Sequence, residues 1–499
     1  MADQPYSIPP APPAPRYPAG KRELILAAAL AVSSVFLWNA ILYGGFSLGF
    51  ALGSIAVILC SVWYLLSCGC RFDWYSGTLM GFSLLIAAGF GWSSSYLKFF
   101  MVQILLFSVN LSLCLLTGQN RRDPGGASSA LDAFRACFSF GFGGLSPALR
   151  GLSDTRKRAD SAGKKWGAAV LGLVIAVPVV AVMGFLLTQA DAAFEGLMAL
   201  LPETDWSEPA WSAVCGLFAA GVAYARALGL RHKEKAVPKE RTFSGISPVT
   251  VNILLGAVAG LYGVYLLSQL AYLGGGFSGI LPEGYTLAQY ARRGFFEMAW
   301  LSALNLGLLC CSMGLVEKGE QAPRLSQLLC LFLGLISLFL VAAASGKMLL
   351  YIRSYGLTRL RVLTELFMVW LAVTTVLVCL WLFRPRLPYM KGAVITALLL
   401  STLTFWVDVD AQVARYNVRA YQSGTLQTID VSHLGNLGCG AVPYLAELAQ
   451  DEDPEVAEAA QRYLKIPSEA IQDLRDWNYS KAAAEKILNA SGSDEQEGS

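Results

Sequence analysis

The chain has 499 residues, of which 55% are hydrophobic and only 15% are Asp, Glu, Lys or Arg. Soluble domains carry about 25% charged residues, so this composition excludes an ordinary soluble protein and predicts an integral membrane protein. The formal net charge of +3 is too small for a protein that binds nucleic acid. We therefore expect the lipid bilayer, and no nucleic acid, as a partner.

Residues 1–22 predict a disordered cytoplasmic tail, because they are polar and include the proline-rich stretch from Pro9 to Pro15. A PxxP ligand role for these prolines is the weaker alternative. The apolar run that follows is long enough to cross a bilayer, so we expect a retained membrane helix instead of a cleaved signal peptide.

Apolar runs of at least about 17 residues, enough to cross about 30 Å of hydrocarbon, recur along the chain. They predict an all-α polytopic transmembrane bundle of about eleven spans, divided into a four-span part (23–118), a basic segment (119–165) and a seven-span part (166–408). The expected spans are residues 23–43, 46–67, 74–92, 97–117, 166–189, 210–229, 249–273, 294–316, 325–346, 362–383 and 391–408.

The basic segment, residues 119–165, orients the bundle because it carries nine Lys or Arg against four Asp. The positive-inside rule places it in the cytoplasm, and alternation then places the N-terminus inside and the C-terminus outside. Within it, residues 131–152 predict a helix and loop on the membrane surface, since Arg135 and Arg150 favour the headgroup region. A re-entrant element is the alternative.

Hydropathy falls sharply after Trp406, and residues 409–489 predict a small helical extracytoplasmic domain. Residues 441–464 resemble one HEAT-type pair of helices, with Pro443 and Pro454 at first helical positions and Asp453 as a cap. A last helix is expected over 481–488. Residues 490–499 predict a disordered end.

Charged residues on the predicted outer side run against the orienting rule, and such charges are usually kept for another reason. In one interpretation the arginines bind an anionic solute or lipid headgroup. In the other, which we favour, they form a salt-bridge network with the acids, helped by the four-residue spacing of Arg293 with Glu297 and of Arg361 with Glu365. The candidate ligand-binding residues are Arg292, Arg293, Glu297, Arg353, Tyr355, Arg359, Arg361, Glu365, Asp408 and Asp410.

Cofactors, metals and catalysis are not expected. The chain has only two histidines, His232 and His433, and lacks a HExxH motif, a Walker loop and a Ser/His/Asp pattern. A membrane enzyme would have to use carboxylates such as Glu297 or Asp410 as acid or base. Asn305, within the predicted eighth span, is expected to form a hydrogen bond between helices.

Four separated segments resemble bacterial membrane proteins of the domain of unknown function 4173, which is close to the domain of unknown function 4153. They are YARRGFFEM (290–298) with the following Leu304-Asn305-Leu306, LYIRSYGLTRLRVLTELFMVW (350–370), VDAQVARYNV (409–418) and RDWNYSKAAAEKIL (475–488). The resemblance covers roughly residues 165–490. It implies a multi-pass protein of the bacterial cytoplasmic membrane with no assigned biochemistry.

Two functions compete most closely on this basis. One is transport or lipid handling through an outer site that binds an anion, although the spans show no clear inverted repeat. The alternative is a sensory, regulatory or scaffolding protein whose helical C-terminal domain binds an extracytoplasmic protein.

Overall fold

The computed structural model describes residue 17 and residues 20–120, 129–158, 183, 207–232, 246–275, 287–314, 324–465 and 471–497. Every regular secondary-structure element in these ranges is a helix, as the apolar runs of the sequence predicted. Nearly all of the predicted fifth span (166–189) and of the N-terminal tail lies outside the described residues. The protein is therefore a membrane-embedded helical bundle.

The described spans are long and apolar. Nine helices in the described ranges have the length and hydropathy to cross a membrane, and a tenth, α3, has 16 residues and would cover only about 24 Å. These ten helices are α1 (Lys21–Asn39, continued by the π-helix η1, Ala40–Gly44), α2 (Leu48–Ser67), α3 (Trp74–Gly89), α4 (Lys98–Leu116), α9 (Ser207–His232), α10 (Pro248–Gly275), α11 (Leu287–Gly314), α12 (Arg324–Tyr355), α13 (Arg359–Phe383) and α14 (Tyr389–Trp406).

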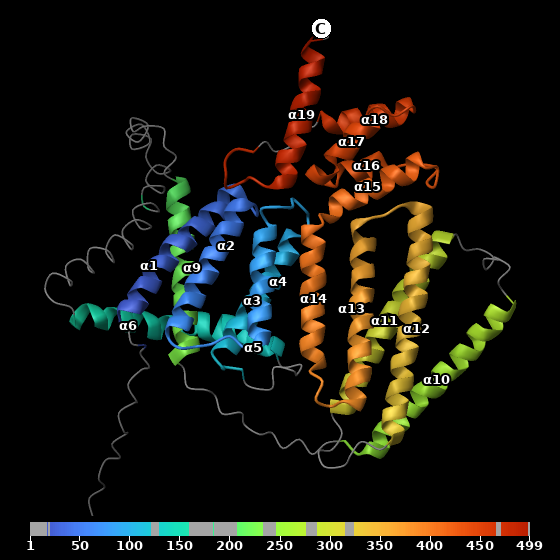
Figure 1. Cartoon of the computed structure of the whole chain (residues 1–499), viewed down its shortest axis with the longest axis horizontal. Helices are drawn as coiled ribbons and strands as arrows, with labels where there is room; N and C mark the ends of the chain where they lie inside the picture. Colours follow the sequence, from blue (N-terminus) through green and yellow to red (C-terminus); the bar gives the residue numbers. More distant parts are fainter. Residues whose placement is uncertain are drawn as a thin grey trace, which may run out of the picture.

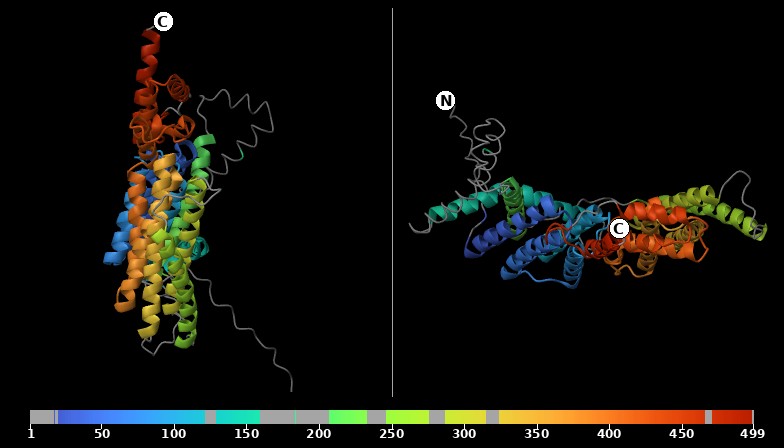
Figure 2. Two further views of the ribbon diagram at one scale, coloured as in Figure 1. Left: turned by 90° about the vertical axis from the view of Figure 1, so that its right-hand side faces the viewer. Right: turned by 90° about the horizontal axis from the view of Figure 1, so that it is seen from above.

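The bundle is a flattened slab, with α1, α2 and α9 toward one end and α10 at the other (Figures 1 and 2). Helices α1 to α4 and α9 share one apolar core, and α10 to α13 form two more. Helix α14 joins these parts, because Phe405 packs on Phe90 and the Trp406 indole donates to the Leu85 carbonyl at 3.0 Å.

Helix α9 differs from its predicted place. The sequence assigns it to the seven-span part, but it packs against α1 and α2. Small residues explain this position: a Cβ on Gly216 would come within 2.4 Å of the Val35 Cα, so the two backbones touch there. Hydropathy measures how apolar a helix is and says little about which neighbour its small residues allow.

Several polar side chains inside the bundle form hydrogen bonds between helices. Tyr262 donates to the Asn305 side-chain oxygen at 3.0 Å, which confirms the predicted interhelical role of Asn305. Ser83 likewise bonds Ser108 at 2.8 Å, between α3 and α4. Away from water, each such pair removes the cost of an unsatisfied polar group.

Short helices lie across one end of the spans. They are α5 (Ser129–Arg135), the π-helix η2 (Ala136–Phe142) and α6 (Leu145–Arg158). Figure 1 shows them crosswise to the bundle. That they lie on the membrane surface stays a prediction. We call this end the opposite face.

The other end, which we call the tail face, carries the tail module, residues 409–497. Its helices are α15 (Val409–Gln422), α16 (Val431–Gly435), the 3-10 helix η3 (Gly438–Ala441), α17 (Val442–Leu448), α18 (Pro454–Leu464) and α19 (Tyr479–Glu497).

The predicted helix pair is present in this module as α17 and α18. The Asp453 carboxylate caps α18 by accepting from the Glu455 amide at 3.0 Å. Helix α19 is longer than predicted and continues to Glu497, through most of the segment 490–499 that the sequence predicts to be disordered. Once a helix has begun, each further residue adds one hydrogen bond, and Glu and Gln favour its continuation.

The close contact of α1 and α9 gives a stability prediction. Gly216→Ala should destabilise the protein by about 1–3 kcal/mol, because the new methyl meets backbone atoms of Val35 that cannot move aside. Gly256→Ala on α10 is the matched control, since a Cβ there meets nothing within 4 Å. Thermal unfolding of both variants in detergent measures the difference. Equal melting temperatures would contradict the packing described.

Candidate functional site

The chain turns sharply where it leaves the last span. Asp408 has a φ of 51°, a left-handed conformation that Asp tolerates better than most residues. Its carboxylate caps α15 by accepting from the Ala411 amide and also accepts from the Ser480 hydroxyl at 2.6 Å. Asp408 therefore joins the end of α14, the start of α15 and the start of α19. Burial raises the pKa of this carboxyl.

Asp410, two residues later, forms an ion pair with Arg359 at the first turn of α13. The same guanidinium donates to the Asn436 carbonyl at 3.0 Å and lies over the Tyr96 ring at 5.7 Å. Asp410 is 2% exposed, and its second oxygen has no hydrogen-bond partner. Arg359 is thus held by groups of the chain itself and connects α13 to the tail module.

Arg361 is held in a different way. It donates to the carbonyls of Tyr355 and Gly356, and its guanidinium lies 4.2 Å from the centroid of the Tyr351 ring. Asn417 of α15 fixes the same turn, since its amide accepts from the Leu357 N–H at 2.6 Å and donates to the Leu357 carbonyl at 2.8 Å. The turn between α12 and α13 is therefore a rigid connection to α15.

The side chains of the other predicted site residues are placed differently from the predicted network. Arg353 and Tyr355 are exposed at the end of α12. Arg361 does not pair with Glu365 as predicted, because backbone carbonyls hold its guanidinium, and the Glu365 carboxylate interacts with Ser345 instead. Glu297 lies within electrostatic range of Lys347, and the side chains of Arg292 and Arg293 lie outside the described part of α11.

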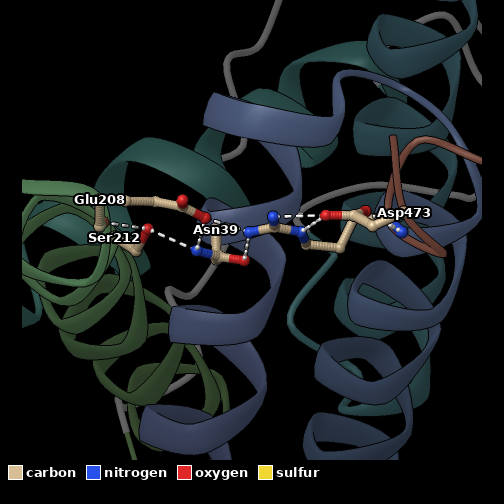
Figure 3. A network of polar contacts seen from close by, with 5 residues as sticks. Asn39, Glu208, Ser212 and Asp473 are labelled. Carbon is tan, nitrogen blue, oxygen red and sulfur yellow. Dashed lines mark hydrogen bonds and ion pairs between the residues drawn. The ribbon is translucent and has the colours of Figure 1, made fainter. Parts of the chain in front are cut away.

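Sequence reasoning missed a second polar network at the tail face (Figure 3). Arg475, before α19, donates to the Asn39 side-chain oxygen at 2.7 Å and forms ion pairs with Glu208 and Asp473. Asn39 in turn donates to Ser212 at 3.0 Å. Figure 3 shows Asn39 at the centre, with Glu208 and Ser212 on one side and Asp473 on the other. The hydrogen bond from Arg475 lowers the pKa of Asp473.

Backbone contacts extend this attachment along residues 475–480, which we call the strap. The Arg475 carbonyl accepts from the Gly49 amide at 3.1 Å, and the Tyr479 amide donates to the Gly91 carbonyl at 3.1 Å. A Cβ on Gly44 would lie 2.8 Å from the Arg475 backbone, so glycine is needed for this close approach. The strap has the sequence RDWNYS, which begins one of the four segments quoted above for the family resemblance. That resemblance was the one sign in the sequence that this segment has a role.

A groove of about 480 Å³ on α15 was also missed. Arg415 and Arg419 are four residues apart, so they share one helical face, and both line it. Tyr416, Ser423 and Thr425 also line the groove, and the hydroxyl groups of Ser423 and Thr425 lie 3.0 Å from each other, within hydrogen-bonding distance. Among the described residues neither guanidinium has an acidic or hydrogen-bonding partner. Their spacing on an amphipathic helix was visible in the sequence.

In the described part of the chain, no three His, Cys, Asp or Glu side chains gather as metal ligands would. Chemically, the tail face offers guanidinium and hydroxyl donors, which suit phosphate or carboxylate.

Comparison with known families gives one match. The family described as "Domain of unknown function (DUF4153)" matches residues 80–448, most of the chain, and confirms the predicted closeness to the domain of unknown function 4153. The match begins earlier than the resemblance noted from the sequence and ends before the strap. The likeness to the domain of unknown function 4173 stays a prediction. No curated protein matches the chain, and neither does any solved structure.

The ion pair of Arg359 with Asp410 predicts an unequal pair of variants. Arg359→Met should cost about 3 kcal/mol, because it leaves a buried carboxylate without its partner. Asp410→Asn should cost less, since the Arg359 side chain is 25% exposed and can be hydrated. Chemical or thermal unfolding of the two variants tests the order, with Arg462→Met on the surface of α18 as a control. A larger loss in Asp410→Asn would contradict it.

Asp408 predicts a pH dependence. Its pKa is raised in the folded state, so the buried charge lowers stability increasingly as pH rises from the ordinary Asp value of about 3.9 through the raised value. Asp408→Asn keeps a capping oxygen and tolerates the same turn. It should therefore gain stability relative to the parent near neutral pH and lose that gain near pH 4. A constant difference across this range would contradict the burial argument.

Proposed function

We propose that this chain, which belongs to the DUF4153 family, binds a phosphate-bearing anion at its tail face through the groove on α15. The anion would come from a lipid headgroup or a solute. The observation that carries the proposal is the pair Arg415 and Arg419, which line one groove and have no acidic partner in the described chain. Two guanidinium groups on one helical face match the acceptor oxygens of a phosphate.

In this proposal Arg353, Arg359 and Arg361, which the sequence analysis singled out, do not bind the anion directly. Arg359 is neutralised by Asp410, and Arg361 is held by two carbonyls and a tyrosine ring. A ligand would have to displace these groups to reach either one. Arg353, exposed at the last turn of α12, adds positive charge to the tail face without such a partner among the described residues.

The way the tail module is attached favours a binding platform over a transporter that alternates its access. Secondary transporters commonly work by rocking one group of helices against another. Here the strap holds α1, α2 and α9, while Arg359 holds α13 to the same module. Helices from both parts of the bundle are thus tied to one body, which opposes rocking. This attachment also supports the second candidate, a scaffold whose tail module binds a protein partner.

The orientation that goes with this proposal follows from charge. The opposite face carries residues 129–158 of the basic segment, and under the positive-inside rule this face would be cytoplasmic. The tail face then lies outside the cytoplasmic membrane of a bacterium. An anionic headgroup of the outer leaflet would meet α15 at this level.

Binding measurements test the proposal. In nanodiscs containing phosphatidylglycerol, native mass spectrometry should find the lipid retained by the parent protein. In detergent, calorimetry with inorganic phosphate tests the free anion. The double substitution Arg415→Ala and Arg419→Ala should weaken whichever binding occurs at least about tenfold, because each charge-assisted contact contributes about 1.5–3 kcal/mol.

The matched control is Arg462→Ala, which removes an exposed arginine from α18 of the same module. Lipid retention without phosphate binding assigns the site to a headgroup, and the reverse assigns it to a solute. Binding that survives the double substitution as well as it survives Arg462→Ala would overturn the proposal. So would a parent protein that binds neither probe.

A further inference from the structure

The segment that lies across the opposite face has two different sides. Ala133, Ala136 and Phe140 are buried on one side, with Phe140 fully so. On the other side Phe134, Phe138 and Phe142 are 62%, 49% and 49% exposed. We call these three residues the aromatic ridge. The described part of α5 and η2 is thus amphipathic in the sense of a helix that lies between two phases.

The buried side packs closely on span α9. A Cβ on Gly141 would lie 3.1 Å from Val222, and one on Gly144 would lie 3.1 Å from the Ala225 carbonyl. Glycines therefore let η2 approach the backbone of α9. This packing fixes which side of the segment faces outward, so the ridge is a property of the fold and not of a freely rotating helix.

The exposed side is a continuous row of rings. Phe134 stacks on Phe138 with centroids 4.3 Å apart, and Phe138 lies 5.8 Å from Phe142. Phe142 lies 6.4 Å from Phe218, which is 59% exposed on span α9. The row thus runs without a break from the crosswise segment onto the surface of a membrane-spanning helix.

We infer that the aromatic ridge inserts into the lipid leaflet at the opposite face and makes residues 129–150 an in-plane membrane element. The occupant is lipid because the row continues the lipid-facing surface of α9. The charge of the surrounding sequence agrees: residues 119–165 contain nine Lys or Arg against four Asp, which suits anionic headgroups. Three large exposed rings in water would be strongly unfavourable.

This inference gives the segment between the fourth and fifth predicted spans a lipid partner. It differs from the proposed anion site in position and chemistry, since it concerns apolar contact at the other end of the bundle. The two can therefore fail independently.

Photocrosslinking in lipid tests it. The photoreactive residue p-benzoylphenylalanine replaces Phe138 in the full chain, in nanodiscs of phosphatidylethanolamine and phosphatidylglycerol. After irradiation, mass spectrometry of the intact protein should show adducts of one lipid mass. The same replacement at Phe134 should give the same adducts. Both positions are exposed, so the bulkier ring should not disturb the fold.

Two controls define the result. The replacement at Phe140 should give no lipid adduct, because that ring is fully buried against the bundle. The replacement at Arg462, exposed on the tail module, should give none above background. Crosslinks from Phe138 to a second copy of the chain would identify a protein interface and overturn the inference. Lipid adducts no more frequent than those from Arg462 would overturn it as well.

Discussion

The guanidinium of Arg475 contacts side chains from two distant parts of the chain, Asn39 and Glu208, and also the nearby Asp473. At the edge of a membrane an unpaired charge or amide is costly, so these groups stabilise one another only while all are in place. The first span, span α9 and the start of α19 must therefore meet at one point. The glycines at 44 and 49 allow the strap to reach that point.

The turn from α14 into α15 is a second constraint on the structure. The strap contacts α1, α2 and Gly91 after α3, and the same module reaches α13 because α14 passes directly into α15. Asp408 makes this turn, and its contact with Ser480 returns to α19. Arg359 then secures α15 from below through Asp410. The module and the bundle thus share one polar boundary, which explains why so many charges occur at the tail face.

The sequence predicts what depends on local pattern. Apolar runs give the spans, Pro454 and Asp453 give α18, and four segments give the resemblance to a family. Pairing depends on three-dimensional position and was harder to infer. Arg361 and Glu365 have the right spacing for an ion pair, yet the turn at Gly356 places two carbonyls closer to the guanidinium. The Arg475 network joins residues more than 250 positions apart, as from Glu208 to Arg475, and no periodicity indicates it.

The charges of the tail face divide into two groups once their partners are counted. Arg359 and Arg475 face Asp410, Glu208 and Asp473, so these sites carry no spare positive charge. Arg415 and Arg419 lie on the side of α15 that bears the groove, while Asp410 and Asn417 lie buried against the turn between α12 and α13. One face of α15 therefore makes contacts within the protein, and the arginines of its other face do not pair with acids of the described chain. Because an anion is attracted by net charge and not by the number of arginines, our proposal assigns the anion to this second face.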